Sequence, residues 1–98
     1  VIHTVGPIWN GGDRGEPELL ASCYRRSIEL SAKAGAASVA FPCISTGVYG
    51  YPVEPAAEIA VATVRDAVAA HTSVREVVFC CFSEDDLVIY EAILRRGA

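Results

Sequence analysis

Apolar residues follow two different spacings along this chain. In three short runs, at 1–5, 38–41 and 77–82, nearly every residue is apolar or β-branched, and glycine or proline follows the first two runs. Runs of this kind, bounded by turn residues, predict β-strands. The run at 77–82 is apolar at every position, which is typical of a central parallel strand covered on both faces.

Between these runs, apolar residues recur every three or four positions, which is the spacing of amphipathic helices. The first helix is predicted from Pro17, a favourable early helical residue, to Gly35, a natural stop. The second helix begins near Pro55. The third follows Ser83, which has the spacing of an N-cap to an acidic third residue, and ends at Gly97.

The alternation of strands and helices predicts an α/β fold with mainly parallel strands joined by helical crossovers. In such folds, ligands gather at the carboxyl ends of the strands. Two loops follow these ends, at 42–53 and 82–86. We therefore expect the chemistry of the protein to lie in these two loops.

Composition limits the class of protein. The chain has 98 residues, of which 52% are hydrophobic and 20% charged, which indicates one globular domain and excludes a disordered chain. A net charge of -4 and a single lysine argue against an extended nucleic-acid interface. Because no apolar stretch suits a membrane span and no secretory signal is visible, we expect a cytoplasmic protein. The sequence lacks methionine and starts within a predicted strand, so we expect a piece of a longer protein.

The loop 42–53 combines two glycines, two hydroxyl residues and two tyrosines with no charged residue. Between a strand and a helix, successive backbone N–H groups are free to converge on an anion. Gly47 and Gly50 permit close approach of a ligand, and the ring of Tyr49 suits a sugar or a base. Two interpretations stay open: a cradle for a phosphate diester or diphosphate, or a tight surface turn that needs its glycines.

Known phosphate and nucleophile motifs fit this loop poorly. A Walker loop requires a lysine, and a dinucleotide fingerprint requires a third glycine. The hydrolase elbow requires a glycine where Cys43 stands. Cys43 beside a helix start is a possible nucleophile, but neither His nor Asn is placed to assist it. We expect all four cysteines to be reduced structural thiols, and no metal site, because Cys80 and Cys81 point to opposite faces of a strand.

Four other residues have a structural and a functional interpretation. We favour His3 as a satisfied strand histidine over a general base, and His71 as a solvated residue at a helix end. Trp9 covers either the core, which we favour, or the edge of a cleft. Phe82, at the carboxyl end of the last strand, either stacks on an aromatic base or lies buried under the third helix.

Three segments resemble the macro domain family: 1–9 (VIHTVGPIW), 40–52 (AFPCISTGVYGYP) and 78–82 (VFCCF). The resemblance implies a truncated three-layer α/β/α sandwich, in which residues 1–98 are the carboxyl-terminal portion of one macro domain. It also implies binding of ADP-ribose, and in the intact protein hydrolysis of O-acetyl-ADP-ribose or of ADP-ribosyl esters on acidic residues. A non-catalytic reader of ADP-ribosylated proteins and an inactive fragment are the alternatives.

By resemblance, the central loop wraps the diphosphate, Tyr49 packs on the distal ribose and Phe82 faces the adenine. The implied ligand-binding residues are Ile44, Ser45, Thr46, Gly47, Val48, Tyr49, Gly50 and Phe82. No catalytic residue, metal or cofactor is assigned, because the family's catalytic groups belong to an amino-terminal half that this sequence lacks. In the family, a further strand separates the counterparts of 1–5 and 38–41, so we expect an open sheet edge and self-association.

Overall fold

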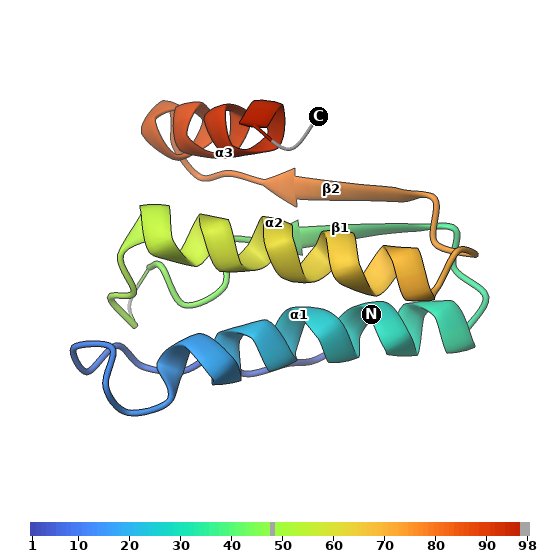
Figure 1. Cartoon of the computed structure of the whole chain (residues 1–98), viewed down its shortest axis with the longest axis horizontal. Helices are drawn as coiled ribbons and strands as arrows, with labels where there is room; N and C mark the ends of the chain where they lie inside the picture. Colours follow the sequence, from blue (N-terminus) through green and yellow to red (C-terminus); the bar gives the residue numbers. More distant parts are fainter. Residues whose placement is uncertain (48, 97–98) are drawn as a thin grey trace.

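The computed structural model describes residues 1–47 and 49–96 (Figure 1). Their secondary structure follows the order α1 (Glu16–Lys33), β1 (Ser38–Pro42), α2 (Val53–Ala70), β2 (Glu76–Cys80) and α3 (Glu84–Arg96). Helix α2 lies between α1 and α3 in this view. Val48, and the predicted helix stop at Gly97, lie outside the described residues.

Strands β1 and β2 pair in parallel, from Ser38 opposite Glu76 to Pro42 opposite Cys80. Helix α2 connects them, which confirms the predicted α/β fold with parallel strands and helical connections. Because the strands run in the same direction and in register, their carboxyl ends meet at one edge of the sheet. The loops that follow Pro42 and Cys80 therefore start side by side.

Only one face of this sheet is covered in the described part of the chain. Residues of both strands alternate between covered and exposed, and Phe41 and Phe79 point into the core, where their rings stack with centroids 6.2 Å apart. Tyr24 of α1 and Tyr90 of α3 pack against these rings at 4.9 and 5.2 Å. All three helices thus share one face, and the described residues contain two of the three expected layers.

The prediction that the run 77–82 is covered on both faces was wrong. Val78 and Cys80 are exposed on the open face, while Val77 and Phe79 are partly buried against the helices. A run of apolar residues cannot distinguish a doubly covered strand from one whose second face meets no partner, since side chains alternate in either case.

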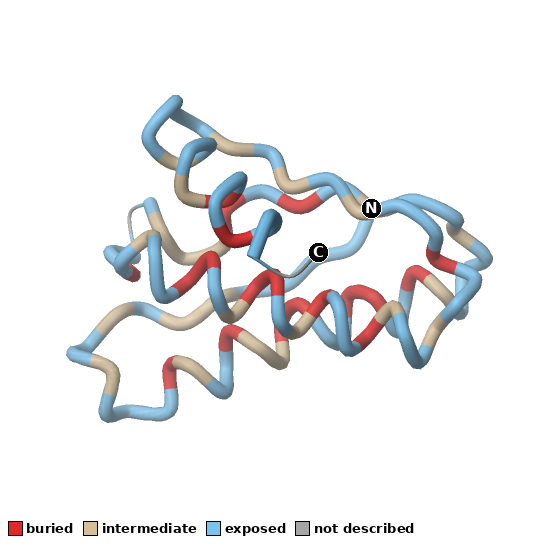
Figure 2. The backbone as a smooth tube through the Cα atoms, turned by 45° about the horizontal axis from the view of Figure 1, so that its top comes forward, coloured by how far each residue is buried: buried red, intermediate tan, exposed pale blue. Residues whose placement is uncertain are grey.

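The helix boundaries follow local signals in the sequence. Ser83 Oγ accepts a hydrogen bond from the N–H of Asp86 at 3.2 Å, which confirms the predicted N-cap. Gly35 follows the end of α1 with φ 81°, and the next amide donates back to Ser31 O at 2.9 Å, as expected for a glycine stop. Figure 2 shows buried residues recurring along α1 and α2. Those of α2 are mostly alanines, which let the two helices approach closely: Ala56, Ala57, Ala60, Val61, Val64 and Ala67.

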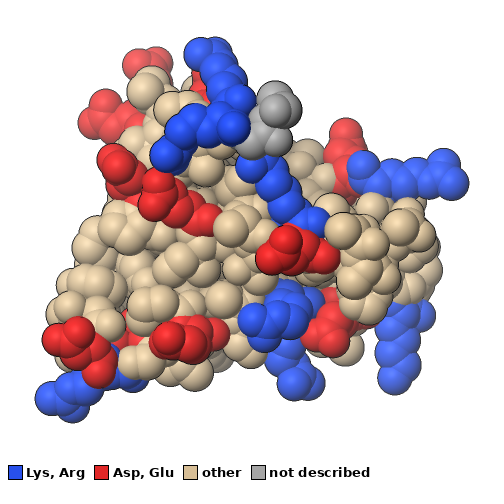
Figure 3. Space-filling view, in the orientation of Figure 1, with Lys and Arg blue, Asp and Glu red and all other residues tan. Residues whose placement is uncertain are grey.

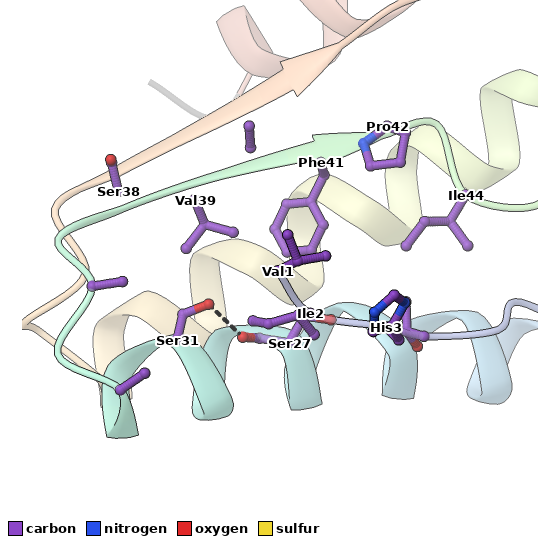
Figure 4. A pocket seen from close by; sticks show the side chains of 14 residues that line it. Val1, Ile2, His3, Ser27, Ser31, Ser38, Val39, Phe41, Pro42 and Ile44 are labelled. Carbon is purple, nitrogen blue, oxygen red and sulfur yellow. Dashed lines mark hydrogen bonds between the residues drawn. The ribbon is translucent and has the colours of Figure 1, made fainter.

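The amino-terminal segment 1–9 is extended but pairs with no strand in the described chain, so the predicted strand at 1–5 was wrong. Its β-branched residues favour extended backbone, but a strand also needs a partner edge within hydrogen-bonding distance. A groove of about 670 Å³ instead separates Val1–Thr4 from β1. Figure 4 shows Val39 and Phe41 of β1 on one side of this groove and Val1 and Ile2 on the other.

Candidate functional site

The loop 43–52 begins at the carboxyl end of β1 and leads directly into α2. Its neighbour is the short connection 81–83 after β2, which carries Phe82. The two strand ends touch, because the Cys43 thiol donates a hydrogen bond to Cys80 O at 3.5 Å. The predicted convergence of both loops at one edge is therefore confirmed.

The loop is closed by its own hydrogen bonds. The N–H of Tyr51 donates to Ser45 O at 2.9 Å, and the N–H of Gly50 donates to Gly47 O at 3.0 Å. Gly50 has φ 75°, in the left-handed region that favours glycine, whereas Ser45 adopts φ 68° despite its side chain. Strained backbone at a non-glycine residue is often found at a functional site.

Gly47 has a different reason to be glycine from the one that turn geometry gives to Gly50. It does not adopt a positive φ, and a Cβ built on it would meet no protein atom within 4 Å. Neither backbone conformation nor internal packing therefore excludes a side chain there. The open space above Gly47 leaves room for a ligand to approach the backbone.

Several donors of this loop have no protein partner. Within the described residues, the N–H groups of Ser45, Thr46 and Gly47 donate to no acceptor of the chain, and the buried Oγ of Ser45 makes no hydrogen bond. Buried polar atoms are normally satisfied, so an orphaned hydroxyl indicates a missing partner. The following helix α2 adds the positive end of its dipole, which favours an anion nearby. This arrangement supports the interpretation of the loop as an anion cradle.

The floor beneath the loop is neutral. Burial raises the pKa of the Cys43 thiol to about 11, so this residue is protonated at neutral pH. A raised pKa disfavours the thiolate, the form in which a thiol attacks, and so argues against Cys43 as a nucleophile. Burial also raises the pKa of Tyr24 to about 12, and its hydroxyl accepts a hydrogen bond from the N–H of Ile44 at 3.4 Å. All four cysteines are free, as expected.

Two aromatic side chains stand at the rim of the site. Tyr49 is 38% exposed and Phe82 is 77% exposed, so both rings are accessible to a ligand. The alternative that Phe82 is buried under the third helix was wrong, because that helix covers Phe79 and leaves Phe82 in solvent. The predicted contacts of these rings with ribose and adenine stay predictions. Val48, the remaining predicted site residue of the loop, lies outside the described residues.

Trp9 connects the amino-terminal segment to the loop. Its ring packs against the core beside Tyr51, with centroids 4.6 Å apart, which confirms the favoured role as core cover. Its backbone N–H also donates to Tyr49 O at 2.9 Å. Trp9 thus has both roles that the sequence left open, since it covers the core and borders the candidate site.

Sequence reasoning missed two residues that shape the site. A Cβ on Gly6 would collide with Ser45 Oγ and Ile44 Cγ2, so the turn at Gly6 lies directly against the loop. Glu16 is 2% exposed and its carboxylate accepts hydrogen bonds from three backbone amides, at Asn10, Gly12 and Arg14. Burial raises the pKa of Glu16, but these backbone hydrogen bonds outweigh burial and lower the pKa to about 2. The sequence signal that could have identified Glu16 is its position between a glycine-rich segment and Pro17, at the start of a helix.

The remaining candidates take no part in the site. His3 is exposed in the unpaired segment, so the prediction of a satisfied strand histidine was wrong. His71 is the half-exposed C-cap of α2, as predicted for a residue at a helix end. Among the described residues, no group of three His, Cys, Asp or Glu side chains is arranged to hold a metal ion.

Surface charge and helix hydropathy do not indicate a further binding surface in the described part of the chain. Figure 3 shows acidic and basic side chains intermixed over one face, without a broad area of either sign. The ion pair between Arg96 and Glu58, at 2.9 Å, is largely exposed and contributes little to stability. No helix in the described ranges is both long and apolar enough to cross a bilayer.

The fold and the loop define an α/β module with a loop of backbone donors, unpartnered among the described residues, at the carboxyl edge of its parallel strands. The family model of the macro domain matches residues 1–60, and the chain belongs to this family. An O-acetyl-ADP-ribose deacetylase of Cronobacter sakazakii is 50% identical over 94 residues, which are 96% of this chain and 52% of that protein. The chain therefore spans about half the length of the curated relatives it matches.

Solved macrodomain structures share this arrangement. The Oceanobacillus iheyensis macrodomain with ADP has a TM-score of 0.90 and 45% identity, over 97% of this chain and 50% of that one. The Trypanosoma brucei macrodomain in complex with ADP-ribose has a TM-score of 0.85 and 40% identity, over 94% of this chain and 38% of that one. Homologous structures thus bind ADP and ADP-ribose.

Proposed function

We propose that residues 44–50 bind the diphosphate of ADP-ribose, in a protein that hydrolyses O-acetyl-ADP-ribose or ADP-ribosyl esters on acidic residues. One observation carries this proposal: three amides and the hydroxyl of Ser45, all without a partner among the described residues, lie in a loop with open space above Gly47. The names of the homologues that bind ADP and ADP-ribose, and of the related deacetylase, support the choice of ligand.

The chemistry of the loop suits a diphosphate held by the main chain. The segment 42–53 has no charged residue, so the negative charge of the ligand meets N–H dipoles and the positive end of α2 rather than a lysine. Preorganised donors of this kind need no rearrangement when the ligand binds. Both aromatic rings are exposed, and in this proposal Tyr49 packs on the distal ribose while Phe82 stacks on the adenine.

In the proposed hydrolysis, these residues orient the substrate and take no direct part in making or breaking bonds. A diphosphate fixed by the loop would hold the distal ribose, and the ester it carries, in one orientation toward an attacking water. Orientation of reacting groups supplies several kcal/mol of the rate enhancement in many enzymes. We assign no catalytic acid or base to this chain.

Gly47→Glu tests the assignment of the loop. The substitution places a carboxylate where the diphosphate should lie, so we expect ADP-ribose affinity, measured by calorimetry on the full-length protein, to fall by about 100-fold or more. Gly47→Ala controls for folding, because the added Cβ meets no protein atom, and its affinity should fall less than that of Gly47→Glu. Unchanged affinity in Gly47→Glu would show that the diphosphate binds elsewhere.

A non-catalytic reader of ADP-ribosylated proteins is the second candidate, because the segment 42–53 carries binding groups and no acidic residue or histidine. The same loop would serve a reader and a hydrolase, so binding alone does not separate them. Incubation of the full-length protein with O-acetyl-ADP-ribose does. Release of acetate supports the hydrolase, whereas tight binding of ADP-ribose with an intact acetyl ester supports the reader.

A further inference from the structure

One buried carboxylate organises the turn that precedes α1. Glu16 Oε2 accepts hydrogen bonds from the amides of Asn10 and Gly12, at 2.7 and 3.0 Å, and Oε1 accepts one from Arg14 at 2.6 Å. The turn 10–14 therefore curls around a single side chain that is 2% exposed. Charge-assisted hydrogen bonds to a carboxylate are about twice as strong as neutral ones.

This turn holds Trp9 in place from the outside. Gly12 adopts φ 93°, and a Cβ on it would lie 2.9 Å from the ring atom Cη2 of Trp9, so the backbone of the turn lies directly on the indole. The indole also packs against Tyr51, with ring centroids 4.6 Å apart. The Trp9 ring therefore contacts both the turn that Glu16 gathers and the end of the loop 43–52.

The same tryptophan reaches the loop through its main chain. The backbone N–H of Trp9 donates to Tyr49 O at 2.9 Å, inside the segment proposed to hold the diphosphate and ribose. A continuous series of contacts thus leads from Glu16 to the turn 10–14, to Trp9 and to the loop. The hydrogen bonds of the Glu16 carboxylate all go to the turn 10–14, not to the loop.

We propose that Glu16 is a positioning residue of the ADP-ribose site, which fixes the shape of the loop 43–52 by seating Trp9 against Tyr49 and Tyr51. The inference rests on the proposed function. Both carboxylate oxygens are needed, because each faces backbone N–H donors. A glutamine of the same shape would turn its own NH₂ group toward one of these donors and lose the hydrogen bonding on that side.

Glu16→Gln in the full-length protein tests this role, with Glu18→Gln as the matched control. Glu18 lies in the same first turn of α1 but is exposed, so its variant removes the same charge without touching the turn 10–14. We expect Glu16→Gln to weaken ADP-ribose binding about tenfold, as for the loss of a hydrogen bond to a charged group, and Glu18→Gln to bind normally. Calorimetry gives the affinities.

Hydrogen exchange measured by mass spectrometry separates positioning from general stability. We expect Glu16→Gln to speed exchange in peptides covering 9–15 and 43–51, and to leave α2 and α3 as in the wild type. Trp9→Ala should weaken binding, and combining it with Glu16→Gln should add little further loss, because both act through one contact. Additive losses would overturn the inference, as would faster exchange throughout the protein.

The outcomes distinguish this inference from the proposed function. If wild-type protein fails to bind ADP-ribose, the proposed function fails, and exchange in 43–51 still decides whether Glu16 positions the loop. If the wild type binds and Glu16→Gln matches it in affinity and exchange, Glu16 has no such role. Should Glu16→Gln not fold, Gly12→Ala displaces Trp9 while keeping the carboxylate. Normal affinity in that variant overturns the inference.

Discussion

The loop 43–52 and the amino-terminal segment 1–9 lie against each other, yet different forces determine their shapes. The described residues of the loop have no regular secondary structure, but hydrogen bonds within the loop close it and the buried side chains of Cys43 and Tyr24 support it. The segment has the stronger β-propensity and pairs with no strand among the described residues. A hydrogen bond from the Cys23 thiol to Val5 O, at 3.4 Å, and the contacts of Trp9 and Gly6 hold it instead.

The comparison shows that closure within a short stretch of chain fixes a structure more firmly than propensity does. Each hydrogen bond inside the loop joins residues a few positions apart, so the ordering entropy is small. A strand needs a neighbouring edge, which local sequence cannot supply. The segment therefore depends on the loop at two points, Gly6 and Trp9, and substitutions at these points should disturb it most.

Gly6→Ala should have the largest effect on stability. The new Cβ would collide with the side chains of Ser45 and Ile44, and overpacking of this kind costs about 1–3 kcal/mol in the free energy of unfolding. Denaturant titration of the full-length protein measures it. Gly47→Ala is the same chemical change in open space, so its effect should stay within about 0.5 kcal/mol. Equal effects in the two variants would show that the segment 1–9 does not pack tightly against the loop at Gly6.

Acid should weaken the turn 10–14, because the ionised carboxylate of Glu16 holds its backbone amides. The pKa of Glu16 is lowered from 4.5 to about 2, because its backbone hydrogen bonds outweigh the effect of burial. A lowered folded-state pKa means that this carboxylate stabilises the protein above about pH 4.5, and that the contribution disappears as the pH falls toward 2. Thermal midpoints between pH 6 and 2.5 test this expectation.

Glu16→Gln provides the comparison for the acid titration. It should already lack the stabilisation at pH 6, and so lose less on acidification than the wild type or Glu18→Gln. Parallel pH profiles for all three proteins would assign the acid sensitivity to other carboxylates.

The sequence predicted the parts of this fold that local signals determine. Helix α3 follows the N-cap Ser83, and α1 ends before Gly35, because caps act on the nearest turn. The position of the loop 43–52 at the carboxyl edge followed from the alternation of strands and helices. The failures share one cause: pairing of the run 1–5 and cover over Val78 both depend on partners that no local pattern contains.

The shape of the candidate site was harder to predict than its place. Residues 44–50 were identified from glycines, hydroxyls and missing charge, and those that the structure describes, 44–47 and 49–50, lie in the connection between β1 and α2. The role of Gly6 depends on a steric fit against the side chains of the loop. The role of Glu16 depends on how the preceding backbone curls around its carboxylate. Neither contact leaves a periodic signature in the sequence.

Ser45→Ala should have the smallest effect on stability and separates the fold of the loop from its binding. The Ser45 hydroxyl has no partner among the described residues, so its removal should change the free energy of unfolding by less than about 0.5 kcal/mol. If the hydroxyl donates to the diphosphate, affinity for ADP-ribose should fall about tenfold. Thr46→Val is the opposite case, because Thr46 Oγ1 donates to Cys43 O at 3.2 Å and the isosteric change removes a hydrogen bond of the loop itself. Its expected loss is about 1 kcal/mol of stability. An alanine at position 45 that binds ADP-ribose normally would mean that the orphaned hydroxyl belongs to the packing of the loop against Gly6 and not to the ligand.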